Sequence, residues 1–377
     1  MTLCWKSFRA LLIVGSAIAA LSPLGGPLHA QQACSDPGLN HLQHPPGTQT
    51  APLGQLGRVD KVGTGPIPMI LIPGAAFGGG AWKSFMEQNR DAYTMYAITP
   101  PGYDGTSPPP WSETADFSDR GWTNALCDAI VRLIDEEKLN RPVIVGHHML
   151  GDHYALRIAL DHPDKVRGVV IISGTPSMAF PAMNANAPGK PVSTATPDQR
   201  VRMVKGFWAP FYKTVTQKMW NAGSFQARTF CRNASRANQL YDQQVAVPIP
   251  TQVRYFLEYM TDDLEPRLEK LQRPLLVLLP NKTWTLDAAL SVYRESNEMM
   301  YGDAEKAKSA WSTNMALMWG DTETGVKWMY DAKFRWERLR GVVPRMTIEI
   351  IDDSETFIME DQPAALDRNL RAFVGSL

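Results

Sequence analysis

The sequence predicts an α/β protein with a mainly parallel central sheet, helices on both faces of that sheet and a helical cap. Three observations lead to this fold class. Short apolar runs alternate with helix-length segments, which is typical of parallel strands joined by crossover helices. Two amphipathic segments have the spacing of helices that lie against a sheet. A long segment with helical apolar spacing separates the fourth predicted strand from the fifth.

The predicted strands and sheet-covering helices follow one another over most of the chain. The apolar runs of strand length lie at residues 69–72, 93–98, 143–145, 166–172, 275–279 and 346–351. The helix before the third run is amphipathic at Leu126, Ile130, Leu133 and Ile134. The last helix of the chain repeats that spacing at Leu366, Leu370, Phe373 and Val374. Both helices are therefore expected to bury an apolar face against the sheet.

These elements divide the chain into consecutive segments. We expect a signal peptide at 1–30, an extended arm at 31–57, the first part of the core at 58–174, a helical cap at 175–272 and the second part of the core at 273–377. The second part carries an insertion, residues 283–340, which is rich in Trp and Met. Trp311, Met315, Met318 and Trp319 share one helical face there. We interpret these side chains as packing the insertion against the body, rather than as a partner surface.

The N-terminus has the features of a secretory signal. Lys6 and Arg9 precede an apolar run over residues 10–21, and the helix breakers Pro23, Gly25 and Gly26 then lead to residues 28–30. The run is shorter than the roughly 20 residues that a membrane-spanning helix needs. No lipoprotein-type box precedes Cys34. We therefore expect a secreted or periplasmic protein that is cleaved after Ala30 and has no stable membrane anchor.

Charge and cysteine usage restrict the partners and the redox chemistry. The chain has 38 basic and 38 acidic residues, so its net charge gives no sign of a nucleic-acid or acidic partner. Removal of residues 1–30 would leave Cys34, Cys127 and Cys231, an odd number for an oxidising compartment. One disulfide with a spare thiol and three inert thiols are both compatible with the sequence, which does not select a pairing.

Three local motifs stand at the ends of predicted strands. The first is Ile-Pro-Gly-Ala-Ala-Phe at residues 72–77, with Trp82 downstream. The second, Val-Gly-His-His-Met-Leu-Gly at residues 145–151, joins a strand directly to a helix. The third occupies residues 352–363 near the C-terminus. Together with the order of elements over about residues 59–374, these motifs resemble the α/β-hydrolase superfamily, in particular its esterases and lipases.

The resemblance implies an oxyanion hole and a nucleophile elbow, which is the sharp turn that presents the catalytic serine. By that match the Ala75 N–H is one oxyanion donor, and Phe77 lies beside the pocket. The elbow position carries His148 instead of serine, and the Met149 N–H is the second donor. Leu150 stands where the superfamily usually has a glycine.

The same resemblance places the other two members of a catalytic triad. Thr356 occupies the position of the catalytic histidine, because Phe357 and Pro363 keep the expected spacing around it. Asp287 is the nearest candidate for the acid after the penultimate strand. A solvated or helix-capping aspartate is the alternative interpretation of Asp287, and Glu355 is a second acid that could approach the pocket edge beside Thr356.

These substitutions exclude ordinary serine-esterase chemistry unless the arm brings His41 or His44 over the pocket, because a serine hydroxyl needs a base within hydrogen-bond reach. The histidines are His29, His41, His44, His147, His148, His153 and His162, and none lies in the C-terminal half. His148 has two interpretations that the sequence leaves open. It is a general base or nucleophile at neutral pH, or it hydrogen-bonds in a pocket that only binds.

The function implied by the resemblance is a hydrolase-like enzyme with a non-standard mechanism, acting on a small, fairly apolar molecule through His148. The alternatives are a catalytically inactive binding protein with the same fold and an interaction module that uses the Trp/Met-rich insertion. No metal is expected, because the partial signature at residues 148–153 has no histidine downstream of His162. No cofactor is expected either, since Gly78-Gly79-Gly80 lacks the Lys-Ser/Thr that completes a phosphate loop.

Overall fold

The computed structural model describes residues 41–111, 116–179 and 195–377. The predicted signal peptide, Cys34 and the first part of the predicted arm lie outside these residues. The remainder of the arm, residues 41–57, contains turns and no helix or strand. His41 and His44 in this segment contact the body through the carbonyl oxygens of Val215 and Pro109.

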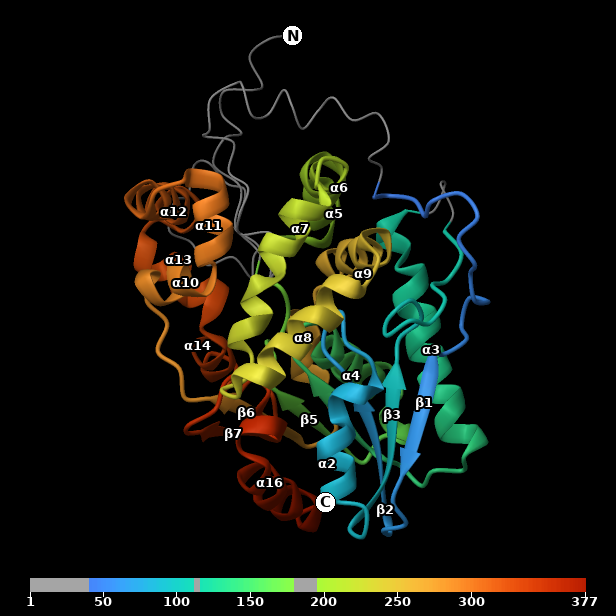
Figure 1. Cartoon of the computed structure of the whole chain (residues 1–377). Helices are drawn as coiled ribbons and strands as arrows, with labels where there is room; N and C mark the ends of the chain where they lie inside the picture. Colours follow the sequence, from blue (N-terminus) through green and yellow to red (C-terminus); the bar gives the residue numbers. More distant parts are fainter. Residues whose placement is uncertain (1–40, 112–115, 180–194) are drawn as a thin grey trace.

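A mostly parallel sheet forms the centre of the molecule, which confirms the predicted fold class (Figure 1). Within the described residues the sheet has seven strands in the order β1-β3-β2-β4-β5-β6-β7, and only β1 is antiparallel to its neighbour. The strands are β1 Arg58–Val62, β2 Ile67–Ile72, β3 Tyr93–Thr99, β4 Val143–His147, β5 Gly168–Ile172, β6 Leu275–Pro280 and β7 Met346–Ile351. Strand β1 was not predicted, because an edge strand with the sequence RVDKV has no apolar run.

Alternate residues of the strands feed two separate hydrophobic clusters, one on each face of the sheet. Ile70 belongs to the cluster with α3 (Gly121–Glu136) and α4 (Leu150–Asp161). Leu71 belongs to the cluster with α2 (Lys83–Gln88), α15 (Ile358–Asp361) and α16 (Pro363–Gly375). The two amphipathic helices predicted from the sequence are α3 and α16, so they lie on opposite faces.

The described part of the segment between β5 and β6 is helical and lies above the carboxyl ends of the strands (Figure 1). Its elements are α5 Pro197–Met203, a π-helical turn Val204–Trp208, α6 Ala209–Tyr212, α7 Gln217–Ser224, α8 Ala234–Ala246 and α9 Ile249–Thr261. Helix α9 is buried along its length and packs on α3. Its Glu258 accepts hydrogen bonds from the amides of Trp122 and Thr123 in the first turn of α3 and pairs with Arg254 at 2.6 Å.

The Trp/Met-rich insertion forms five consecutive helices among the described residues: α10 Leu286–Val292, α11 Arg294–Tyr301, α12 Ala304–Trp319, α13 Thr322–Tyr330 and α14 Ala332–Glu337. Trp311, Trp319, Trp328 and Trp336 are all buried. Their burial supports the interpretation that these aromatic residues pack the insertion. The indole N–H of Trp336 also donates to the Gly174 carbonyl at 2.9 Å, which fixes α14 beside the end of β5.

Cys127 and Cys231 are free and buried, and they belong to different clusters on opposite faces of the sheet. A disulfide between these two cysteines is therefore excluded. Among the described helices, none is long and apolar enough to cross a membrane.

Candidate functional site

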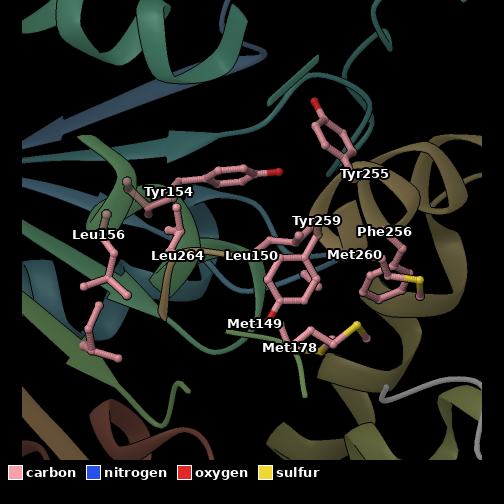
Figure 2. Packing of buried hydrophobic residues seen from close by; sticks show 14 of the residues in the cluster. Met149, Leu150, Tyr154, Leu156, Met178, Tyr255, Phe256, Tyr259, Met260 and Leu264 are labelled. Atoms are coloured by element: carbon pink, nitrogen blue, oxygen red, sulfur yellow. The ribbon is translucent and has the colours of Figure 1, made fainter. Parts of the chain in front are cut away.

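A pocket of about 160 Å³ lies where the carboxyl ends of the strands meet the α5–α9 segment and the insertion. The elbow and the terminal loop, which are far apart in sequence, meet here: His148, Met149 and Thr356 all line the pocket. Figure 2 shows Met149 at the start of α4, close to two further lining residues, Met178 and Tyr259. An engineered cavity of about 150 Å³ holds benzene, so this pocket has room for about one aromatic ring.

The backbone between β4 and α4 turns sharply at two consecutive residues. His148 has a φ of 31°, and Met149 has a φ of 59° with a ψ of −101°. Side chains other than glycine are strained in this region, at a cost of order 1–3 kcal/mol each. The rigid sheet on one side and α4 on the other hold these residues in place, and both side chains face the pocket.

His148 presents a neutral imidazole with a fixed tautomer. Its Nδ1 lies 3.2 Å from the carbonyl oxygen of Ser173. Because a carbonyl can only accept a hydrogen bond, Nδ1 carries the proton and Nε2 keeps its lone pair. Nε2 is buried and has no hydrogen-bond partner among the described residues. Burial lowers the pKa of His148 to about 4, so the ring is neutral at pH 7.

His147 holds the terminal loop against the elbow. It is fully buried, and its Nε2 donates to the Thr356 carbonyl at 3.0 Å. Its ring packs edge-on against Phe357 at a centroid distance of 4.5 Å. Burial lowers the pKa of His147 to about 3. These contacts describe a structural histidine that positions Thr356 beside His148.

Three residues of the predicted site, Ala75, Phe77 and Asp287, are absent from the pocket lining. Phe77 is 1% exposed and packs against Phe357 at 5.2 Å, so it is a core residue and not a pocket residue as we predicted. Asp287 lies in the first turn of α10 with its side chain 74% exposed, and it pairs with Lys308 at 2.8 Å. The structure does not bring Asp287 to His148, so the prediction that it is the catalytic acid is wrong. Asp287 is instead a solvated aspartate near a helix N-terminus, which was the alternative interpretation.

Ala75 lies in the turn after β2 and is 6% exposed. In this turn the Phe77 amide donates to the Gly74 carbonyl at 3.1 Å. Gly74 itself lies against the elbow, because a Cβ there would come within 3.0 Å of the His148 carbonyl oxygen. The predicted convergence of the Ala75 and Met149 amides on one oxyanion remains a prediction.

Glu355 was predicted from the sequence to approach the pocket edge, whereas other charged and polar groups of the lining were not predicted. Lys282 and Glu355 form an ion pair of 2.8 Å across the loops that follow β6 and β7. Glu355 thus reaches the pocket edge beside Thr356. Arg335 of α14 and Ser173 at the end of β5 also line the pocket. Lys282 and Ser173 follow parallel strands closely, and this position would have indicated that they belong to the site. No local pattern in the sequence indicates that Arg335 belongs to it.

A buried carboxyl group lies next to this pocket. Asp152 in the first turn of α4 is fully buried and accepts hydrogen bonds from the amides of His153 at 2.6 Å and Thr175 at 2.8 Å. Burial outweighs these hydrogen bonds and raises the pKa of Asp152 to about 7. The folded protein therefore keeps a proton on Asp152 at pH values where the unfolded chain has released it.

This raised pKa predicts a loss of stability with rising pH. Between pH 5 and pH 7 the free energy of unfolding should fall by up to about 1.4 kcal/mol per pH unit on account of Asp152. Asp152→Asn cannot ionise, so this part of the pH dependence should vanish, whatever constant loss the substitution causes. Urea denaturation of both proteins at pH 5 and pH 7 measures the difference. An equal change in the two proteins would contradict the assignment.

A second pocket, of about 210 Å³, lies at the opposite edge of the sheet. Its lining includes four arginines, each just before one of the adjacent parallel strands β4, β5, β6 and β7: Arg141, Arg167, Arg273 and Arg345. It contains none of the residues at the elbow. Nowhere in the described ranges do three or more His, Cys, Asp or Glu side chains form a group that could hold a metal ion.

Comparison with known proteins identifies the family. The model of a family described as "Alpha/beta hydrolase family" matches residues 69–366, which is most of the chain. The chain belongs to the alpha/beta hydrolase family. No curated protein sequence matches it.

Solved structures show the same alpha/beta hydrolase fold at low identity. An esterase from Thermogutta terrifontis with malate bound has 14% identity and a TM-score of 0.51, over 85% of this chain and 93% of that one. An esterase from Exiguobacterium antarcticum has 13% identity and a TM-score of 0.53, over 84% and 94%. A hydrolase from Pseudomonas aeruginosa has 14% identity and a TM-score of 0.54, over 84% and 93%. At these identities the likeness extends to the fold alone.

Family membership allows the elbow to be aligned by its glycines. A Cβ on Gly151 would lie 2.5 Å from the Pro73 carbonyl oxygen, so only glycine fits where α4 meets the end of β2. In the Gly-x-Ser-x-Gly pattern the nucleophile stands two residues before the second glycine. Counted back from Gly151, that residue is Met149, which directly precedes α4. Alignment by Gly146, as in the sequence analysis, gives His148, and neither residue carries a hydroxyl group.

Proposed function

We propose that this alpha/beta hydrolase family member binds a small molecule of about the size of an aromatic ring beside His148, and that it does so without forming an acyl-enzyme. The observation that carries the proposal is the partner of His148. A catalytic imidazole is normally oriented by a carboxylate that stabilises its protonated form. Here the partner is the Ser173 carbonyl, and burial keeps the ring neutral.

The energetic consequence for acid–base chemistry is large. Lowering the pKa of His148 from 6.5 to about 4 disfavours its protonated form by about 3 kcal/mol. A general base works best when its pKa lies near the working pH. The imidazole is therefore better suited to accept a hydrogen bond from a ligand than to take up its proton.

A second candidate function is favoured by the lone pair on Nε2 of His148. This atom is unpartnered within the described residues and belongs to a pocket residue. A ligand with an acidic C–H or O–H could lose its proton to it, in a lyase, isomerase or hydrolase step. In that case His148 acts as a general base or nucleophile, as the sequence analysis considered.

Covalent labelling and turnover together test the proposal. A fluorophosphonate, which modifies activated serines, should leave the protein unlabelled, as read from its intact mass. His148→Ala should weaken binding of a ligand found in a metabolite screen by about tenfold, the effect of one hydrogen bond. Stoichiometric labelling of any serine would refute the proposal. Ligand turnover that disappears in His148→Ala would establish the second candidate function instead.

We also propose export to the periplasm or the exterior, with removal of residues 1–30. The support is the order of this segment, in which basic residues are followed by a short apolar run and then by helix-breaking Pro and Gly residues. Expression of the full chain in a bacterial host should yield a periplasmic species that begins at Gln31. Intact mass after osmotic shock identifies the first residue. A membrane-bound species that retains Met1 would contradict the proposal.

A further inference from the structure

The pocket contains a buried cation whose charge the described residues only partly compensate. Arg335 is 2% exposed and lines the pocket. Its nearest carboxylate is that of Glu265, whose Oε2 lies 3.5 Å from Arg335 Nη2. The other oxygen of Glu265 pairs with Arg338 at 3.3 Å. Two guanidinium groups therefore share one carboxylate.

Neighbouring charges do not make up the difference. Arg200 and Asp263 form a pair of their own at 2.7 Å. Lys282 and Glu355, at the other side of the lining, neutralise each other. Asp152 is mostly protonated at pH values well below 7, because burial raises its pKa to about 7. The surroundings of Arg335 thus carry about one excess positive charge in a buried site, which is costly unless an anion pairs with it.

Hydrogen bonding at Arg335 is also incomplete. Nε of this side chain is buried and has no hydrogen-bond partner within the described part of the chain. Among the described residues, the hydrogen-bond contacts of Nη2 are long, at 3.5 Å to Glu265 and to the Ser177 hydroxyl. A guanidinium presents its Nε–H and Nη–H groups as a fork that matches the two oxygens of a carboxylate. The backbone of Arg335 is held beside the end of β5, because the next residue, Trp336, is hydrogen-bonded to Gly174.

The rest of the lining is suited to an apolar body. Trp284, Tyr293, Met329 and Tyr330 contribute aromatic and apolar side chains from the insertion. Trp284 stacks on Tyr330 at a centroid distance of 5.2 Å. With a volume of about 160 Å³, the pocket has room for one ring or a short branched chain together with one small polar group.

We infer that the ligand of this pocket is a small carboxylic acid with an aromatic or apolar body, whose carboxylate pairs with Arg335. This inference rests on the proposed binding function and specifies the class of molecule. An inorganic oxyanion such as phosphate would pair with the guanidinium but leave the aromatic wall unused. A neutral ring compound would fill the apolar part and leave the cation uncompensated.

Benzoate, its neutral isostere benzamide and inorganic phosphate distinguish these cases in titration calorimetry on the full chain. Benzoate should bind about tenfold or more tightly than either of the others, because it satisfies both parts of the pocket. Arg335→Gln should reduce the preference for benzoate over benzamide to about one. Arg335→Lys should keep part of it, since the charge remains but the fork is lost.

Arg340→Gln is the matched control, because Arg340 pairs with Glu337 at the surface and does not line the pocket. This variant should keep the wild-type preference. Equal binding of benzoate and benzamide to the wild type would overturn the inference while leaving the binding function intact. If phosphate binds as tightly as benzoate, the inference that the ligand has an aromatic or apolar body is wrong. If neither benzoate nor benzamide binds, the result also counts against the proposed function. If Arg335→Gln does not fold, the inference is tested by the ratio of benzoate to benzamide affinity in the wild type and in Arg335→Lys.

Discussion

Glu258→Ala is expected to lower the free energy of unfolding by about 3–5 kcal/mol, the cost of breaking a buried ion pair by removing one partner. Glu258 is 0% exposed and 2.6 Å from Arg254. It is also the acceptor for the Trp122 and Thr123 amides, which have no earlier turn of α3 to bond to. The substitution therefore leaves a buried guanidinium and two amides without their partner. Urea denaturation measures the loss.

Glu323→Ala provides the matched control for this prediction. Glu323 and Lys327 form the same kind of pair one helical turn apart, at 2.7 Å, but the Glu323 side chain is 78% exposed. Its removal should change the free energy of unfolding by less than about 0.5 kcal/mol. The double variant Glu258→Ala with Arg254→Ala should be less destabilised than the sum of its single variants, because no unpaired charge remains. A loss below about 1 kcal/mol in Glu258→Ala would mean that Glu258 does not dock α9 on the first turn of α3.

Met149→Ser combined with Thr356→His is expected to create slow hydrolysis of activated aryl esters. The first change places a hydroxyl at the residue that precedes α4, and the second places an imidazole on the loop that His147 holds against the elbow. A positioned base contributes about 10²–10⁴-fold, and the lower end applies here because no acid orients the new histidine. The rate should therefore exceed that of Met149→Ser alone by about 10²-fold. Hydrolysis of p-nitrophenyl acetate measures it.

His148→Ser combined with Thr356→His is the comparison that decides the elbow alignment. Alignment by Gly146 places the nucleophile at His148, whereas the position of Gly151 favours Met149. If Met149 is the elbow residue, the His148 version should show little gain over His148→Ser. A faster His148 version would restore the first alignment. Failure of both double variants, while folded, would show that Thr356 does not face the elbow with its side chain.

The sequence by itself determined the sheet and the helices that cover it. Buried strands such as β2 and β6 are continuous apolar runs, and α3 and α16 show one apolar face, so local patterns are sufficient to find them. The edge strand β1 was not predicted, because its residues are exposed or only partly buried and form no apolar run. The resemblance to the α/β-hydrolase superfamily implied that the elbow and the loop with Thr356 belong to one site, and the structure brings them together.

Only the tertiary structure decided which side chains complete that site. Asp287 and Phe77 follow the family spacing, yet one pairs with Lys308 at the surface and the other packs into the core. The alignment of the elbow depends on the approach of Gly151 to the carbonyl of Pro73, a contact between segments remote in sequence. The neutral state of His148 and the uncompensated charge of Arg335 depend in the same way on burial and on distant partners. Local periodicity encodes backbone conformation and the direction of burial, whereas pairing and protonation are properties of the assembled surroundings.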